Sequence, residues 1–158
     1  MRILALSVLY LMLWQYAGSV VAYAAPATVD TSTSSQATAD SSQRKVFFDS
    51  LNEIHWAFYY NGSAVEYSYS ADGESWTSAG TLAYDTSHFS AIYKTIGGTS
   101  YVFVVAEANT YDVVLRRGTL GASNINFEGE ITVFDGTADD NKYIKPTVAI
   151  SANNQLWV

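Results

Sequence analysis

Hydrophobic and polar residues alternate in short runs from about residue 44 to the end of the chain. The clearest run covers residues 65–69, where Val, Tyr and Tyr alternate with Glu and Ser. An alternation with a period of two predicts a β-strand that has one buried face. No run after residue 43 has the spacing of an amphipathic helix, so every element predicted there is a strand. The predicted strands are Val46–Phe48, Ile54–Tyr60, Val65–Tyr69, Trp76–Thr77 with Thr81–Tyr84, Ala91–Ile96, Tyr101–Ala106, Tyr111–Arg116, Ile131–Phe134, Thr147–Ile150 and Leu156–Val158.

Turn-forming residues separate these runs. Asn61-Gly62 is a dipeptide typical of a tight type I′ hairpin. Between the third and fourth predicted strands the sequence reads Ser70-Ala71-Asp72-Gly73-Glu74-Ser75-Trp76. An Asp in such a turn accepts hydrogen bonds from the turn's own amides, and a Gly tolerates a positive φ. Trp76 then begins the next strand as a large apolar residue that fills the space between strands.

A repeat of this pattern predicts how the strands are arranged. Residues 46–56 align without a gap with residues 148–158, at an offset of 148 − 46 = 102. Residues 92–103 repeat the order of strand, Gly-rich turn and strand about 46 residues after the first unit. The repeating unit is therefore about 46 to 56 residues and four strands long, which is typical of one blade of a β-propeller.

The predicted fold class is all-β: a partial β-propeller of about two four-stranded antiparallel blades plus the start of a third. The first blade covers residues 44–90, the second residues 91–146, and the start of the third residues 147–158. Closed propellers have about four to eight blades, and a blade does not bury its faces alone. We therefore expect a truncated N-terminal fragment of a larger protein whose remaining blades close the ring. The alternative is a two-blade chain that closes a ring by self-association.

The first 43 residues have a different composition. Residues 1–24 predict a secretory signal peptide, because Arg2 precedes an apolar stretch and Ala22-Tyr23-Ala24 has the pattern of a cleavage site. An uncleaved membrane anchor is the alternative, since the apolar character continues to about residue 25. Residues 25–43 are rich in Ser, Thr and Ala and predict a disordered linker. The mature chain is expected to be secreted or extracytoplasmic, without a membrane span.

The turn at Ser70, Asp72, Gly73 and Trp76 resembles the Asp-box, or bacterial neuraminidase repeat, in its Ser-x-Asp-Gly-x-x-Trp form. In the sialidase-like propeller superfamily this box lies between the third and fourth strands of a blade, which is also its place in the predicted strand order. The resemblance covers about residues 44–158 and implies a structural role for the four residues, far from any active centre. The corresponding residues 117–123 of the second unit lack the Asp and the Trp.

The same resemblance implies an active site that this chain does not complete. Sialidases hold the substrate carboxylate with three arginines and use a Tyr nucleophile assisted by a Glu, together with an Asp acid/base. The family's first arginine lies in an aromatic-Arg-Ile-Pro motif, whereas Arg44 is followed by Lys45-Val46-Phe47-Phe48. Arg116 and Arg117 are neighbours on a predicted strand and point to opposite faces. We therefore assign no catalytic residue and no cofactor.

Composition narrows the classes of partner. The chain has 158 residues, a net charge of −7 and no cysteine. The acidic balance argues against a nucleic-acid partner, which needs clustered Lys and Arg. The absence of cysteine excludes disulfides, zinc–thiolate sites and a Cys nucleophile. Through the resemblance, a glycan or polysaccharide is the expected partner.

Two residues are candidates for contact with a glycan. His55 and Trp56 lie in the second predicted strand, where a His can line a sugar site and a Trp can stack on a pyranose ring. The plainer interpretation is strand alternation, with one of the two side chains in the core and the other on the surface. His88 lies in the polar loop 85–88 and is expected to be solvated. It is too far from His55 in the sequence to indicate a metal site.

Two further features have local explanations. The acidic loop Asp135–Asn141 offers oxygen ligands, so calcium is a candidate there, although their order does not follow the EF-hand loop. Asn61-Gly62-Ser63 has the form of a glycosylation sequon, and the hairpin turn already accounts for these residues.

These observations predict an exported sialidase-like β-propeller fragment that recognises a glycan or a cell surface without catalysis in this chain. One alternative is the N-terminal part of an exo-sialidase or other glycoside hydrolase. Another is a structural repeat module of an envelope or adhesion protein. The same fold serves all three, so the choice depends on the site.

Overall fold

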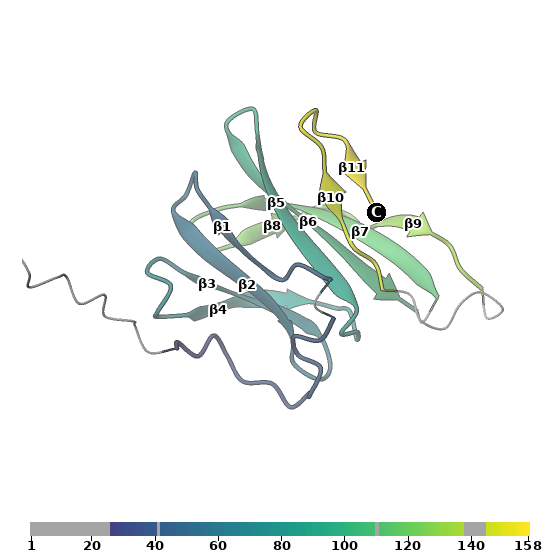
Figure 1. The fold of residues 1–158 in the computed structure, drawn as a ribbon, viewed down its shortest axis with the longest axis horizontal. Helices are drawn as coiled ribbons and strands as arrows, with labels where there is room; N and C mark the ends of the chain where they lie inside the picture. The colour runs from purple at the N-terminus through teal and green to yellow at the C-terminus, as the bar shows by residue number, and fades with distance from the viewer. Residues whose placement is uncertain (1–25, 41, 110, 138–144) are drawn as a thin grey trace, which may run out of the picture.

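The computed structural model describes residues 26–40, 42–109, 111–137 and 145–158 (Figure 1). Across these ranges the chain is all-β: it contains eleven strands and no helix. The strands form three antiparallel sheets, none of which closes into a barrel. The prediction of an all-β fold with antiparallel strands is confirmed. The predicted signal peptide, residues 1–24, lies outside the described residues.

The first sheet is a four-stranded meander in the order β1-β2-β3-β4. Its strands are β1 (Val46–Asp49), β2 (Ile54–Tyr60), β3 (Val65–Ser70) and β4 (Thr77–Leu82). The sequence predicts a broken fourth strand, whereas β4 is continuous. The pairing of β3 with β4 shifts register between Tyr67 and Ser68. This β-bulge absorbs the irregularity that the sequence pattern shows as a gap in the strand.

The second sheet contains five strands and has the same meander order. Its path is β5 (Phe89–Ile96), β6 (Thr99–Ala108), β7 (Asp112–Leu120) and β8 (Ile125–Phe127), and β9 (Ile131–Phe134) also pairs with β7. Only the second of the two short strands, β9, is predicted from the sequence. Strand β8 has three residues, which is too short for an alternation of polar and apolar residues to be visible. β5 begins at Phe89, two residues before the predicted start of the second unit.

The third sheet is the hairpin of β10 (Ala149–Ile150) and β11 (Leu156–Trp157). In Figure 1, β1–β4 lie on the left and the β10–β11 hairpin lies toward the upper right, over a second sheet that extends further right to β9. The second sheet has a hydrophobic cluster on each of its faces, one shared with the first sheet and one shared with the hairpin.

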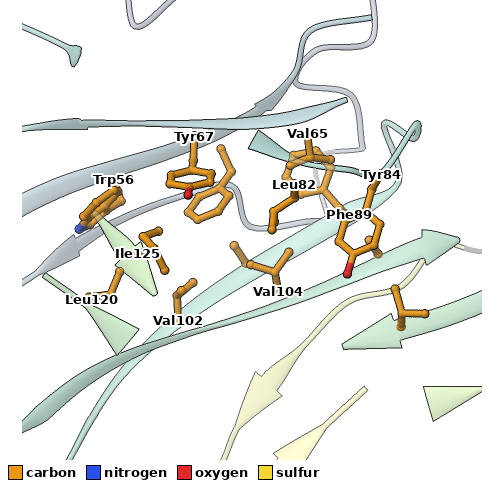
Figure 2. Packing of buried hydrophobic residues seen from close by; sticks show 14 of the residues in the cluster. Trp56, Val65, Tyr67, Leu82, Tyr84, Phe89, Val102, Val104, Leu120 and Ile125 are labelled. Atoms are coloured by element: carbon orange, nitrogen blue, oxygen red, sulfur yellow. The ribbon is translucent and has the colours of Figure 1, made fainter. Parts of the chain in front are cut away.

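The main core lies between the first and second sheets. Figure 2 shows Trp56, Tyr67 and Leu82 from the first sheet opposite Val102 and Val104 from the second. A second core lies between the other face of the second sheet and the chain around β10. It contains Ile92, Phe103, Val105, Val113 and Val148. Burial of these aliphatic and aromatic side chains is the main stabilising contribution.

The hydrogen bonds between the first two strands of each sheet show which face of that sheet packs on the next sheet. In the first sheet Phe47 lies opposite Trp56, and both side chains pack in the main core. The Phe58 amide donates to the Lys45 carbonyl, so Lys45 and Phe58 are a hydrogen-bonded pair. Hydrogen-bonded and non-hydrogen-bonded pairs alternate along an antiparallel ladder, so the pair of Phe47 and Trp56, two residues away on each strand, is also hydrogen-bonded. The hydrogen-bonded pairs of the β1–β2 hairpin therefore point to the second sheet.

The second sheet follows the same rule in the same direction. The bond from the Glu107 amide to the His88 carbonyl places Ile92 and Phe103 in a hydrogen-bonded pair, and both side chains pack toward the β10–β11 hairpin. In the β10–β11 hairpin the Ser151 amide donates to the Gln155 carbonyl, so Ala149 and Trp157 are also a hydrogen-bonded pair. The Trp157 side chain is 63% exposed. Each sheet thus packs the face that carries its hydrogen-bonded pairs against the other face of the next sheet. The sheets stack head to tail, unlike the two sheets of a sandwich.

Residues 26–40, here called the strap, form hydrogen bonds with the first sheet. They form neither helix nor strand, as expected of the predicted linker 25–43. However, Ser32 Oγ donates to the Tyr60 carbonyl at 2.7 Å, and the Tyr60 amide donates to the Ala37 carbonyl at 3.1 Å. These contacts place part of the predicted linker against the first sheet, which the composition of the segment does not predict. Polar side chains and backbone groups hold it against the β2–β3 hairpin, a kind of interaction that a count of apolar residues does not detect.

Candidate functional site

The turn between β3 and β4 is held by its own side chains. Ser70 Oγ accepts the Gly73 amide at 2.8 Å and donates to Asp72 Oδ1 at 2.9 Å. Asp72 Oδ1 also accepts the amides of Ser75, at 2.7 Å, and Glu74, at 2.8 Å. These hydrogen bonds hold the pKa of the Asp72 carboxyl well below its usual range. The bond from the Ser75 amide lowers the pKa most, followed by the bond from the Glu74 amide. The carboxylate therefore stays charged and serves the turn.

Gly73 and Trp76 complete the same turn. Gly73 has φ +75°, in the left-handed region that favours glycine. The Trp76 indole is half-buried, and its Nε1 donates to the Gly73 carbonyl at 3.2 Å. Because the four residues that resemble an Asp-box bond mainly to one another, the turn presents a structural arrangement rather than a reactive one.

His55 and Trp56 point to opposite faces of β2, as strand alternation predicts. The His55 ring is half-buried and lies 4.6 Å from the ring of Phe48, centroid to centroid. Trp56 has no exposed surface and packs against the rings of Tyr67 and Tyr69. The glycan-stacking role considered for Trp56 is therefore wrong for this structure, since a buried ring cannot receive a sugar. His55 retains part of its exposure.

His88 is less solvated than its loop suggested. Its Nδ1 lies 2.7 Å from Glu107 Oε2, and its Nε2 lies 3.7 Å from Asp40 Oδ2. The imidazole thus lies between the strap and the end of β6. Asp40 also forms an ion pair with Lys145. Four residues distant in sequence meet here, and the sequence shows no spacing that would predict their contact.

An acidic pocket of about 510 Å³ lies beside this cluster. Three parts of the chain line it: the connection from β4 to β5, the end of β6, and the residue before β9. Its lining residues are Ala83, Tyr84, Asp85, Thr86, Glu107, Ala108, Asn109 and Glu130. The volume falls within the range of about 300–1,000 Å³ that is typical of small-molecule pockets.

Hydroxyl groups already donate to the carboxylates of this pocket. The Tyr84 hydroxyl donates to Glu130 Oε2 at 2.8 Å, and the Tyr60 hydroxyl donates to Asp85 Oδ1. Burial, and then the hydrogen bond to Glu130, raise the pKa of the Tyr84 phenol. Tyr84 therefore remains protonated at neutral pH and acts as a donor, not as a nucleophilic phenolate.

The lining determines which ligands the pocket can accept. Asp85, Glu107 and Glu130 supply carboxylate oxygens, and Asn109 supplies an amide. No Lys or Arg is among the described residues that line it. The pocket therefore favours hydroxyl and ammonium donors and repels carboxylates. Sequence reasoning did not identify this site, because its residues come from separate loops. The only sequence signal is the polar loop 85–88, where His88 is expected to be solvated.

The two arginines do not meet at this pocket: Arg116 interacts with the hydroxyl of Tyr84, which lines it, and Arg117 lies elsewhere. The Arg116 guanidinium lies over the ring of Phe127, a residue that packs against the main core. The Arg117 guanidinium lies over the ring of Tyr101, a residue that packs against the second core. The two side chains thus lie on opposite faces of the second sheet. Arg117 also pairs with Glu128 at 2.6 Å.

Comparisons with known proteins found no matching family model, no matching curated protein and no matching solved structure. Among the described residues, no group of three or more His, Asp or Glu is arranged to hold a metal ion. The calcium candidate, the loop 135–141, lies partly outside those residues, at 138–141. A search of the same ranges finds no helix with the length and apolar character needed to cross a membrane.

Proposed function

We propose that this chain is an exported protein built from sialidase-like β-propeller blades, and that it recognises a glycan without cleaving it. The observation that carries the proposal is the acidic pocket, in which three carboxylates, an amide and Tyr84 face one space. Sugars offer several hydroxyl donors on a rigid ring, and a pocket rich in oxygen acceptors matches them.

The charge of the pocket selects among glycans. Three carboxylates without a lining cation disfavour a ligand that carries its own carboxylate. The proposed ligand is therefore a neutral or amine-bearing saccharide rather than a sialoside. This assignment departs from the substrate that the family resemblance implies, and it agrees with the divergence of Arg116 and Arg117 to opposite faces.

The propeller part of the proposal is supported by the stacking of the sheets. Three sheets that pack head to tail follow the geometry of successive blades, whereas a sandwich has two inner faces packed together. The Asp-box-like turn joins the third and fourth strands of the first sheet. Exposure of Trp157, which like the buried Trp56 belongs to a hydrogen-bonded pair of its hairpin, supports a further sheet as its neighbour.

Binding of the whole chain to neutral oligosaccharides, to chitosan oligosaccharides and to sialyllactose tests the proposal by glycan array and calorimetry. We expect binding to one of the first two classes and none to sialyllactose. Glu130→Gln keeps the shape of the pocket and removes one charge, so it should weaken binding of an amine-bearing sugar. Glu74→Gln, on the exposed Asp72 turn, is the matched control and should bind like the unaltered chain. EDTA should leave binding unchanged.

Selective binding of sialyllactose would overturn the assignment of the ligand. Failure of every glycan class to bind would favour the alternative of a structural repeat module.

A glycoside hydrolase is the second candidate, because most glycosidases use two carboxylates that flank the scissile bond. Asp85, Glu107 and Glu130 supply enough carboxylates in one pocket. Fluorogenic neutral glycosides and a fluorogenic sialoside separate the two candidates. We expect no turnover of either. Turnover that is lost in Glu130→Gln and kept in Glu74→Gln would replace recognition with hydrolysis.

A further inference from the structure

The loop between β2 and β3, residues 61–64, contains an Asn-Gly dipeptide whose Asn side chain is held in one orientation. Asn61 is half-buried, whereas Gly62 and Ser63 are exposed. Asn61 Oδ1 accepts three hydrogen bonds: from the Ser63 amide at 2.8 Å, from the Ser63 hydroxyl at 3.0 Å and from the Ala64 amide at 2.9 Å. A bond to the amide two residues on folds an Asn side chain back onto its own backbone.

The three donors make the side-chain carbonyl of Asn61 electrophilic. They draw electron density from Oδ1, and they can stabilise the negative charge that develops on this oxygen when a nucleophile adds to Cγ. Two of the three are backbone amides of the same loop, from Ser63 and Ala64. The folded loop therefore holds a partial oxyanion site around its own side chain.

The backbone nitrogen of Gly62 is the nucleophile beside this carbonyl. When the nitrogen of the next residue attacks Cγ of an Asn, a succinimide ring closes. A side chain on that next residue hinders the approach, and Gly has none. Among the described residues, no group accepts a hydrogen bond from the Gly62 amide. This nitrogen is therefore available to lose its proton to solvent and attack.

The surroundings of the leaving group predict a consequence for the strap. Asn61 Nδ2 donates to Glu66 Oε1 at 2.6 Å. A carboxylate formed at residue 61 would lose this donor and place two like charges together. The Asn61 carbonyl also accepts the amide and the hydroxyl of Thr33 in the strap. The loop that gains the charge is therefore the loop that anchors the strap.

We propose that Asn61 is a self-modification site, at which the side-chain amide is replaced by an acid and the strap is released. In the first step the Gly62 nitrogen gives its proton to solvent and bonds to Asn61 Cγ. The Cγ–Nδ2 bond breaks, and Nδ2 takes a proton from solvent and leaves as ammonia. In the second step water adds to either carbonyl of the succinimide and opens the ring to aspartate or isoaspartate. This site is separate from the acidic pocket and does not depend on glycan recognition.

The whole folded chain, kept in mildly alkaline buffer and digested in mild acid at intervals, tests the reaction by peptide mass spectrometry. We expect residue 61 to convert to a mixture of aspartate and isoaspartate. Asn124 is the internal control: it is exposed, but it precedes Ile125, whose branched side chain hinders ring closure. Conversion no faster than that of Asn124, or conversion to aspartate without isoaspartate, would overturn the proposal.

Ser63→Ala tests whether the folded loop promotes the reaction. This variant removes the hydroxyl donor to Oδ1 and leaves Asn61 and Gly62 in place. We expect conversion to be about two- to tenfold slower than in the unaltered folded chain. In urea, where the loop loses its hydrogen bonds, the two chains should react at equal rates. Equal rates in the folded chains would contradict the assignment of a partial oxyanion site.

Asn61→Asp tests the release of the strap, because it supplies the product charge and keeps an acceptor for the loop amides. Hydrogen exchange at the Thr33 amide should become faster, while exchange in β6 stays slow. Adding Glu66→Gln removes the opposing charge and should restore slow exchange. Asn124→Asp, at an exposed position beside the second sheet, is the matched control and should not change exchange at Thr33. Unchanged exchange at Thr33 in Asn61→Asp would overturn the release of the strap.

Discussion

The Ser100 hydroxyl, at the start of β6, donates a hydrogen bond of 2.7 Å to Oδ1 of Asp49, at the end of β1. Asp49 has no exposed surface, and its carboxylate also accepts the Leu51 amide and both the amide and the side chain of Asn52. Asn52 in turn donates to the Leu120 carbonyl in β7. A buried carboxylate thus organises the β1–β2 turn and joins the first sheet to the second.

Ser100→Ala should destabilise the fold by about 1 to 3 kcal/mol, because it removes a donor to a buried charged acceptor. Urea unfolding at pH 7 measures this change in the free energy of unfolding. Ser63→Ala, at an exposed hairpin position, is the control and should have a smaller effect. Equal effects of the two substitutions would show that the Ser100–Asp49 bond does not stabilise the contact between the sheets.

The Asp49 carboxyl also predicts a pH dependence. Burial raises its pKa, but the hydrogen bonds from Ser100, Asn52 and Leu51 outweigh this effect, so the pKa lies below its usual value. A depressed pKa in the folded state contributes stability above the unfolded-state value of about 3.9, and this stability is lost as the pH falls through the folded-state pKa. Asp49→Asn should flatten this acid limb in urea unfolding curves recorded between neutral pH and pH about 3. An unchanged acid limb would contradict the assignment.

Gly73→Ala should destabilise the chain by about 1 kcal/mol, because φ at Gly73 is +75°. An added Cβ would lie 3.7 Å from the His55 ring, an ordinary contact, so the cost comes from the backbone. Gly129→Ala is the matched control: its Cβ would meet nothing within 4 Å. Thermal melts of both variants check the prediction, which fails if Gly129→Ala costs as much as Gly73→Ala.

Trp56→Ala should cost about 3 to 5 kcal/mol, since it removes the largest fully buried side chain of the main core. Trp56→Phe should cost less. It keeps an aromatic ring in contact with Tyr67 and Tyr69, and it removes the buried Nε1 donor, which has no partner. Denaturant unfolding monitored by circular dichroism compares the two. A phenylalanine variant as unstable as the alanine variant would mean that the indole shape is essential.

Tyr59→Phe should loosen the strap without unfolding the sheets. The Tyr59 hydroxyl contacts Asp30, Glu66 and Ser68, and of these only Asp30 belongs to the strap. Hydrogen exchange at the Thr33 amide, which bonds to the Asn61 carbonyl, should become faster, while exchange at amides in β6 stays slow. Unchanged exchange at Thr33 would show that backbone hydrogen bonds alone hold the strap.

The local elements of this fold could be predicted from the sequence because they depend on neighbouring residues. Alternation in residues 65–69 predicted β3, and the bonds around Asp72 involve residues at most three apart. Asn61-Gly62 correctly marked the connection between β2 and β3, but the type I′ turn is wrong: the loop has four residues, 61–64, and φ is positive at Gly62 and not at Asn61. Prediction failed where local signals were weak, as at the three-residue strand β8. The sequence also carries no signal of the hydrogen bonds between the strap and the β2–β3 hairpin, because their partners are distant along the chain.

The sequence by itself determined most of the strands, the Asp72 turn and the apolar face of strands such as β3, because side-chain period and turn chemistry are local properties. Only the tertiary structure decided that Trp56 is buried, that Arg116 and Arg117 lie on separate faces, and that Asp85, Glu107 and Glu130 share a pocket. Those relationships join residues from different loops and sheets. They depend on how the sheets stack, and this stacking brings together residues whose spacing along the chain carries no signal of contact.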